Sequence, residues 1–265
     1  RVIYQHSKAE GVWENDPVNF SHDDSKIQRF SNEFNNDKFS QFALTLKREV
    51  ANHSLTYAGS YLDRDVQYQT DYSKYGEDAY FVPYYACDYS ATGPDLATQS
   101  ATDCTSLYEY YHADNAYTRS SHELRLQSIN GRLQYTVGAF WQEAEHKYLE
   151  LWLQPGMSPS QAVNPALYGP NVYFRTDQKR RETQFALFGE AVYNFSDAFS
   201  VTFGMRSYDE TSKIKGVVGW ADDAGGYGYD TPSDSEVSFN GEVFKFSLAY
   251  KINDDHMIYA TYSEG

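Results

Sequence analysis

Hydrophobic and polar residues alternate with a period of two along several stretches of the chain, as in β-strands with two unlike faces. The clearest stretch is 132–142, in which the apolar positions are Leu133, Tyr135, Val137, Ala139 and Trp141. The same alternation occurs at 42–47, 55–61, 123–127, 184–194, 199–206 and 244–252, and Met257 and Tyr259 begin one more strand. None of these apolar faces carries a charge. The pattern predicts an all-β, antiparallel structure of about eight strands.

Short and long connections alternate between these strands. Tight turns are expected at 50–53, 129–131, 196–198 and 253–255, and one contains Asn130-Gly131, a strong hairpin dipeptide. Long polar connections are expected at roughly 11–28, 67–116, 152–178 and 209–238. Compact soluble domains rarely use such long connections, whereas outer-membrane barrels have short periplasmic turns and long extracellular loops. The chain is therefore expected to be part of a transmembrane β-barrel.

The aromatic residues fit this orientation. Placing the tight turns at the periplasm puts Tyr193, Phe199 and Tyr250 near one membrane interface and Tyr61 and Trp141 near the other. Roughly 9–11 tilted residues cross the hydrocarbon, so the two aromatic girdles have about the expected separation. The alternative is a large soluble β-sandwich, which explains the alternation but explains the one-sided loop lengths poorly.

Composition narrows the class of protein. The chain has 265 residues, 17 % of them aromatic, and a formal net charge of -15. This acidity argues against nucleic acid as a partner, because phosphate binding depends on Lys and Arg. The mean hydropathy of -0.68 does not exclude a membrane barrel, in which alternate residues face a polar lumen. No apolar run approaches the ~20 residues of a spanning helix, and no signal peptide is visible at Arg1, so a secreted product would be mature or truncated.

The two cysteines, Cys87 and Cys104, lie in one polar, Tyr-rich segment. Their spacing suits a disulfide within a loop, which would indicate an oxidising compartment. Two free surface thiols are the alternative.

Several segments resemble the barrels of TonB-dependent receptors. They are SHELRLQS at 121–128 followed by YTVGAFW at 135–141, FALFGEA at 185–191 leading into VTFGMR at 201–206, and IYATYSEG at 258–265. The resemblance spans most of 1–10 and 38–265. It implies active uptake of a scarce nutrient, often a ferric siderophore, through a barrel of about 22 strands that is filled by a plug domain and energised by TonB.

By this resemblance residues 1–265 are part of the barrel domain, and the plug domain is absent from the sequence. The implied location is the outer membrane of a Gram-negative bacterium. The implied partners are outer-membrane lipid, the plug and TonB of the parent protein, and a small-molecule ligand such as a metal chelate. A passive porin-type barrel and a secreted carbohydrate-binding or carbohydrate-cleaving β-protein remain alternatives.

No catalytic constellation is found, so neither an enzyme nor a cofactor is expected. The seven His are scattered, and none has the spacing of a paired metal site. Ser121 and Ser128 lie in no G-x-S-x-G turn. The pairs Asp23-Asp24 and Asp222-Asp223 could contribute to a Ca²⁺ site, but solvated loop charge is the commoner meaning of such pairs, and no metal site is predicted.

Six charged residues fall on the faces predicted to line the lumen. They are Glu123, Arg125, Arg132, Glu190, Arg206 and Lys245. A charge inside a barrel needs water or a partner beside it. These residues either hold the plug or line a substrate path, or they form a generic wet wall, and the sequence favours neither interpretation.

Aromatic residues in the long connections are the candidates for substrate contact. They are Tyr80, Tyr84, Tyr85, Trp220, Tyr227 and Tyr229. Aromatic side chains supply rigid, amphipathic contact area at low entropic cost. The alternative is that the loops pack on one another through these rings.

Overall fold

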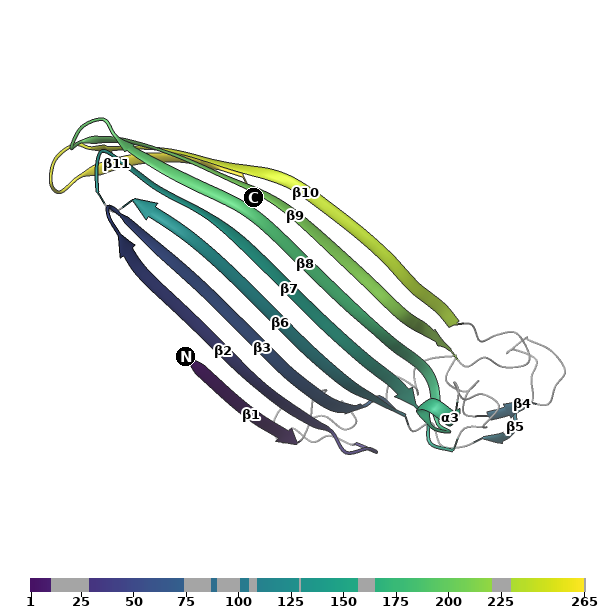
Figure 1. Ribbon diagram of the computed structural model, residues 1–265. Helices are drawn as coiled ribbons and strands as arrows, with labels where there is room; N and C mark the ends of the chain where they lie inside the picture. The colour runs from purple at the N-terminus through teal and green to yellow at the C-terminus, as the bar shows by residue number, and fades with distance from the viewer. Residues whose placement is uncertain are drawn as a thin grey trace.

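One large antiparallel sheet dominates the computed structural model, which describes residues 1–10, 29–73, 87–89, 101–104, 109–128, 130–156, 165–220 and 230–264. Nine strands follow one another in chain order across this sheet (Figure 1), close to the predicted number. They are β1 (Val2–Glu10), β2 (Phe34–Val50), β3 (His53–Asp71), β6 (Tyr110–Ser128), β7 (Leu133–Leu153), β8 (Val172–Asn194), β9 (Phe199–Trp220), β10 (Asp230–Lys251) and β11 (Met257–Ser263). Among the described residues β1 and β11 have one neighbour each, so the sheet is open.

Two short strands and one helical turn lie outside the large sheet. The strands β4 (Cys87–Tyr89) and β5 (Ala101–Cys104) pair with each other, and α3 (Pro165–Tyr168) precedes β8. No helix within the described ranges is long and apolar enough to cross a membrane.

The four predicted tight turns are confirmed, and they lie together at one end of the sheet, opposite the end that carries the long connections (Figure 1). The β2–β3 turn places Ala51 at a φ of 53°, and the β6–β7 turn places Gly131 at a φ of 115°. Left-handed φ values of this kind match the twist of tightly connected antiparallel strands. The asymmetry of connection lengths is therefore a property of the fold.

The strand register confirms the face assignments made from the alternation. Ala139 of β7 lies opposite Leu124 of β6 on one side and Leu187 of β8 on the other. Farther along the sheet, Val201 of β9 lies between Tyr193 of β8 and Leu248 of β10. Apolar residues of neighbouring strands thus form one continuous apolar belt on one face, made up of Phe42, Leu44, Leu46, Leu55, Leu124, Leu133, Val137, Phe185, Leu187, Phe203, Phe246 and Leu248.

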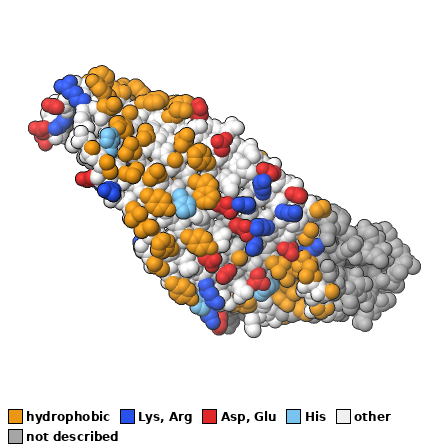
Figure 2. Space-filling model, viewed as in Figure 1, with side chains coloured by type: hydrophobic (Ala, Val, Ile, Leu, Met, Phe, Trp, Pro, Cys, Tyr) orange, Lys and Arg blue, Asp and Glu red, His pale blue; other side chains and the backbone are white. Residues whose placement is uncertain are grey.

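These large side chains are exposed, and Figure 2 shows apolar side chains gathered on the turn-side half of the face it views. No second sheet covers the belt within the described part of the chain, so the described residues do not form the β-sandwich considered as the alternative. A soluble protein rarely exposes so large a continuous apolar surface, whereas a barrel presents it to lipid. We call this side of the sheet the outer face and the opposite side the inner face.

The last strand contributes its even-numbered positions to the belt. The register places Ile258 opposite Tyr250 and Tyr262 opposite Phe246, all on the outer face. Met257 and Tyr259, the apolar residues by which the sequence marked this strand, therefore point to the inner face. Both parities of β11 carry apolar residues, so alternation alone could not orient this strand.

The strands continue well beyond the belt. β7 has 21 residues and β8 has 23, about twice the number needed to cross hydrocarbon. The predicted connection 209–238 was therefore too long, because β9 extends to Trp220 and β10 begins at Asp230. Beyond the lipid, water contacts both faces of the sheet, so apolar and polar residues no longer alternate. The sequence pattern therefore does not mark these segments, although the strands still pair.

Substitutions on the two faces should have unequal effects. Leu187 is 55 % exposed on the outer face, and Leu187→Arg should destabilise the assembled barrel by ~2–4 kcal/mol because it places a cation in hydrocarbon. Gln134→Arg, at an exposed inner-face position, should have little effect. Reversible unfolding in lipid vesicles measures both, and equal losses would contradict the assignment of the faces.

The predicted disulfide stays a prediction. The register pairs the backbones of Cys87 and Cys104 directly across β4 and β5, an arrangement that suits a cross-strand bond. We expect the intact mass of the protein to rise by two hydrogens on reduction. An unchanged mass would mean free thiols.

Candidate functional site

Five of the six charged residues predicted to face the lumen lie together on the inner face. They line one groove of about 460 Å³, and we call them the inner charged cluster: Glu123, Arg125, Glu190, Arg206 and Lys245. Arg125 forms an ion pair with Glu123 at 2.7 Å on β6. The Lys245 ammonium donates to the Glu190 carboxylate at 2.8 Å. These four groups form two half-buried ion pairs, an arrangement that suits charges in a lumen.

Gly204 explains how Lys245 reaches Glu190 across an intervening strand. In the register Gly204 of β9 lies directly between Glu190 of β8 and Lys245 of β10. A Cβ at this position would lie 3.4 Å from the Lys245 Cβ and 3.6 Å from a Glu190 carboxylate oxygen. Both distances are ordinary van der Waals contacts, so a side chain larger than that of alanine would occupy the space through which the ion pair crosses β9.

Arg206 is held by a neutral partner and an aromatic ring. Its guanidinium donates to the Gln184 side-chain oxygen at 3.2 Å and lies 5.4 Å from the centre of the Phe140 ring. The Gln184 amide in turn donates to Glu210 at 3.1 Å.

Arg132 is not part of this cluster. It lies in the β6–β7 turn and is exposed, and its carbonyl oxygen accepts the backbone N–H of Asn194 at 2.9 Å. The structure therefore groups five of the six predicted residues and leaves Arg132 at the turn end of the sheet.

Aromatic side chains cover the inner face nearer the long connections. We call them the aromatic wall: Tyr68, Tyr111, Tyr117, His146, Tyr148, Trp152 and Phe174. Tyr111 contacts Trp152 edge-on at 4.6 Å between ring centres, and Trp152 contacts Phe174 edge-on at 4.9 Å. Tyr117 and His146 are stacked at 4.0 Å. These residues come from four adjacent strands, β3, β6, β7 and β8.

Hydrogen bonds fix the polar side chains of the wall. Arg64 donates two bonds to Asp37, at 2.9 and 2.6 Å, and its guanidinium lies 5.7 Å from the centre of the Tyr117 ring. Tyr148 donates to the Gln178 side-chain oxygen, and the Gln178 amide donates to Ser233 at 2.6 Å. The wall combines flat apolar area with fixed donors and acceptors, which are the features of a small-molecule surface.

A buried carboxyl group lies where the wall meets the connections. Glu109 is 1 % exposed and one of its oxygens accepts the Tyr173 hydroxyl at 2.9 Å. Burial, opposed by this hydrogen bond and reinforced by the charge of Asp71, raises the pKa of Glu109 to about 7. Asp71 accepts the backbone N–H groups of Ser31 at 2.7 Å and Ser73 at 3.0 Å. The bond from Ser31 joins the end of β3 to residues that precede β2, and the bond from Tyr173 joins Glu109, at the start of β6, to β8.

Residues 4–265 match the family model for the TonB dependent receptor-like β-barrel. The chain belongs to the TonB-dependent receptor family. Members of this family are transporters rather than enzymes, and they are outer-membrane β-barrel proteins of Gram-negative bacteria. No curated protein sequence matches the chain closely enough to count as a relative.

Solved siderophore receptors share the fold of this receptor barrel. The ferric yersiniabactin uptake receptor FyuA of Yersinia pestis matches with a TM-score of 0.66 and 10 % identity, over 98 % of this chain and 33 % of that one. The ferric-catecholate import receptor Fiu of E. coli matches with a TM-score of 0.56 and 12 % identity, over 90 % and 37 %. The siderophore receptor PiuA of Acinetobacter baumannii matches with a TM-score of 0.54 and 10 % identity, over 87 % and 32 %. The chain thus spans about a third of the length of these receptors.

Sequence reasoning missed the aromatic wall of this receptor barrel. Tyr68 and Tyr111 fell within the predicted connection 67–116, although they lie on β3 and β6. A signal was present on β7, where His146, Tyr148 and Trp152 keep the inner-face parity of the lumen residues below them. An aromatic pattern of period two beyond the belt therefore marks the wall.

The loop aromatics stay predictions for this receptor barrel. Tyr80, Tyr84, Tyr85, Tyr227 and Tyr229 lie outside the described residues, as do the pairs Asp23-Asp24 and Asp222-Asp223. Trp220 ends β9, and its backbone pairs with that of Phe174. Within the described ranges no three His, Cys, Asp or Glu residues are grouped as metal ligands.

The buried Glu109 should make the end of this receptor barrel that carries the long connections sensitive to pH. Its folded pKa of about 7 exceeds the ordinary 4.5, so the folded state binds the extra proton. The resulting stabilisation is complete below pH ~4.5 and is lost as the pH rises through 7. The total loss is at most ~3.4 kcal/mol. Amide exchange of Tyr72, which donates to the Glu109 carbonyl at 2.9 Å, reports opening of this end.

After correction of the Tyr72 exchange rate for intrinsic exchange, the free energy of opening should decrease as the pH is raised from 5 to 8. Glu109→Gln, which mimics the protonated group, should remove this dependence. A wild-type profile as flat as that of the variant would disprove the assignment.

Proposed function

We propose that this chain is part of the barrel domain of a longer outer-membrane receptor that takes up a small-molecule chelate, with ferric siderophores as the ligand class and TonB as the source of energy. The aromatic wall is the observation that carries the proposal. Family membership and the siderophore receptors with the same fold support the ligand class. Outer-membrane lipid, a plug domain and TonB are the partners that this function requires.

The wall has the position that a ligand-capturing surface needs. On β7 the belt ends near Trp141, and the wall residues His146, Tyr148 and Trp152 follow it toward the long connections. They face inward, where a molecule entering from outside would pass. Edge-on and stacked rings supply a rigid amphipathic surface, and the Arg64 guanidinium, held by Asp37, lies beside the Tyr117 ring.

The inner charged cluster lies deeper, at the level of the belt. Glu190 and Lys245 form an ion pair and line the inner-face groove together with the other residues of the cluster. A plug domain in the lumen could therefore replace this ion pair with contacts to its own side chains. We therefore assign the wall to ligand capture and the cluster to contact with the plug. These two roles predict different losses on substitution.

The test uses the full-length receptor with two probes, ferric yersiniabactin and a ferric catecholate. For the chelate that binds, Trp152→Leu should raise Kd about fivefold to tenfold, corresponding to the ~1–1.5 kcal/mol of an aromatic contact. Lys245→Met combined with Glu190→Gln should leave Kd within twofold and reduce uptake by iron-starved cells. Equilibrium binding and radioactive iron uptake measure the two effects separately.

Trp141→Leu is the matched control, because it removes the same side chain from the outer face and should leave Kd unchanged. A receptor that binds neither chelate, or one whose affinity is insensitive to Trp152→Leu, would count against the proposal. Uptake that continues without TonB would instead favour the passive porin-type alternative.

A further inference from the structure

A half-buried carboxyl group, that of Glu150, lies at the centre of the aromatic wall. Its neighbours on the inner face are four rings of the wall. They are Tyr148 and Trp152 on the same strand, Tyr111 on β6 and Phe174 on β8. The residues directly opposite Glu150 are small, Ala113 on β6 and Thr176 on β8. The register therefore places one acidic side chain within a frame of aromatic residues.

Glu150 has no ion-pair partner within the described part of the chain. Other carboxylates of the inner face do pair with cations, as Asp37 does with Arg64. The first inner-face cation along β8 is Arg180, which lies opposite His146. This position is four residues closer to the belt than Glu150, or roughly 13 Å along the strand. A half-buried carboxylate without a cation has a desolvation cost that folding alone does not require.

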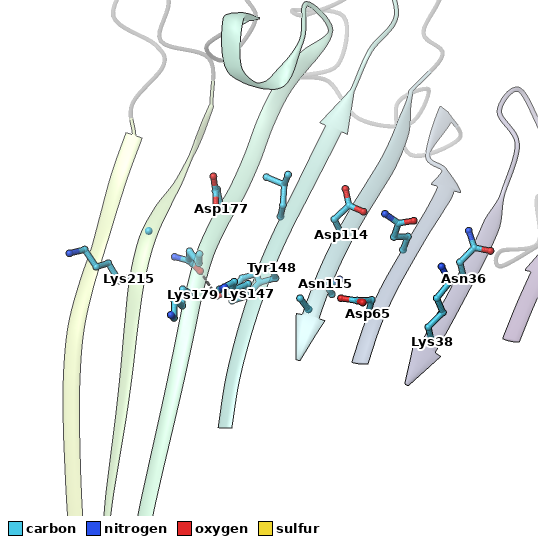
Figure 3. A pocket seen from close by; sticks show the side chains of 15 residues that line it. Asn36, Lys38, Asp65, Asp114, Asn115, Lys147, Tyr148, Asp177, Lys179 and Lys215 are labelled. Atoms are coloured by element: carbon cyan, nitrogen blue, oxygen red, sulfur yellow. Dashed lines mark hydrogen bonds between the residues drawn. The ribbon is translucent and has the colours of Figure 1, made fainter. Parts of the chain in front are cut away.

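Three lysines at this level of the sheet point to the outer face instead. Lys147 of β7 lies opposite Lys179 of β8, which lies opposite Lys215 of β9, and all three line a groove of that face (Figure 3). Lys147 is close to Glu150 in the chain, but side chains an odd number of residues apart on a strand point to opposite sides. These lysines therefore do not neutralise Glu150.

The charge of Glu150 acts on the phenols around it. Burial, the hydrogen bond with Tyr68 and then the nearby Glu150 carboxylate raise the pKa of Tyr111. Burial also raises the pKa of Tyr148, where the charge of Arg180 opposes the rise and the charge of Glu150 adds to it. Both phenols are neutral at pH 7, so they add no charge to that of the carboxylate.

The rings of the frame are held in place. The hydroxyl of Tyr148 donates to the Gln178 side chain, the bond drawn as a dashed line in Figure 3. The hydroxyl of Tyr111 shares a hydrogen bond of 3.0 Å with that of Tyr68. Ring faces attract cations that lie within about 6 Å of the ring centre, and aromatic cages for ammonium groups use this attraction. A fixed frame of rings with a carboxylate at its centre suits a cation.

We infer that Glu150 and the rings around it bind a positively charged substituent, such as a primary ammonium group, on the chelate that the receptor takes up. The inference rests on the proposed function and adds the charge of the ligand to it. The rings attract the charge and cover the carbon atoms next to it, and the carboxylate accepts hydrogen bonds from the N–H groups. A chelate with a carboxylate in place of the ammonium group is repelled by Glu150.

The test compares two ferric chelates on the full-length receptor in neutral detergent. One is a linear trihydroxamate with a free terminal ammonium group, and the other is the same chelate with this amine acetylated. The two forms share the iron centre and differ by one positive charge. The wild type should bind the ammonium form at least tenfold more tightly, as measured by equilibrium binding.

Glu150→Gln keeps the shape of the side chain and removes its charge. This variant should bind the ammonium form about tenfold more weakly and the acetylated form within twofold of the wild type, so the acetylated form reports whether the site is intact. Glu145→Gln removes the same charge from the outer face of the same strand. It is the matched control and should change neither Kd by more than twofold.

Equal affinity of the wild type for the two forms, or an unchanged preference in Glu150→Gln, would overturn the inference. So would failure of the ammonium form to bind a receptor that binds ferric yersiniabactin or a ferric catecholate. Binding of the ammonium form that depends on Glu150, without TonB-dependent uptake of its iron, would instead count against the proposed function alone.

Discussion

Backbone hydrogen bonding without water is the constraint on which this structure depends. In hydrocarbon an unpaired N–H or C=O costs several kcal/mol, so a strand that crosses a membrane must pair on both sides. The sheet meets this requirement through seven of its nine strands, each hydrogen-bonded to two neighbours that follow in chain order. Pairing of consecutive strands needs only short turns at one end of the sheet. These turns follow Val50, Ser128, Asn194 and Lys251.

Given this pairing, the two faces of each strand perform separate tasks. The outer face carries the apolar belt and, above it, a band of charge. The inner face carries the ion pair between Glu190 and Lys245 at belt level and the stacked Tyr117 and His146 above it. A single strand such as β7 contributes to all of these regions, because successive side chains point to opposite sides. Membrane anchoring and the proposed ligand contact are thus built from interleaved residues of the same segments.

The sequence allowed prediction of the features that hydrocarbon enforces. The alternation around Leu133–Trp141, the outer face of the belt strands that precede β11 and the positions of the four turns are confirmed by the register. The strand segments beyond the lipid were missed, since no apolar face marks them there. The aromatic wall was missed because it lies on these same strand segments. The register that brings its residues together is set by strand pairing at the level of the apolar belt. Cross-strand neighbours such as Lys147 and Lys179 depend entirely on that register, because they are separated by more than 30 residues in the chain.

Strands that continue as a rigid ladder past the membrane have a consequence for how such a barrel diversifies. At Tyr148 or Trp152 a substitution alters what a passing molecule meets and leaves every outward position unchanged. Insertion or deletion of one residue would instead exchange inside and outside for the rest of the strand. In this part of the protein, new ligand preferences are therefore accessible by point substitution at alternate positions, while changes in length are confined to the connections.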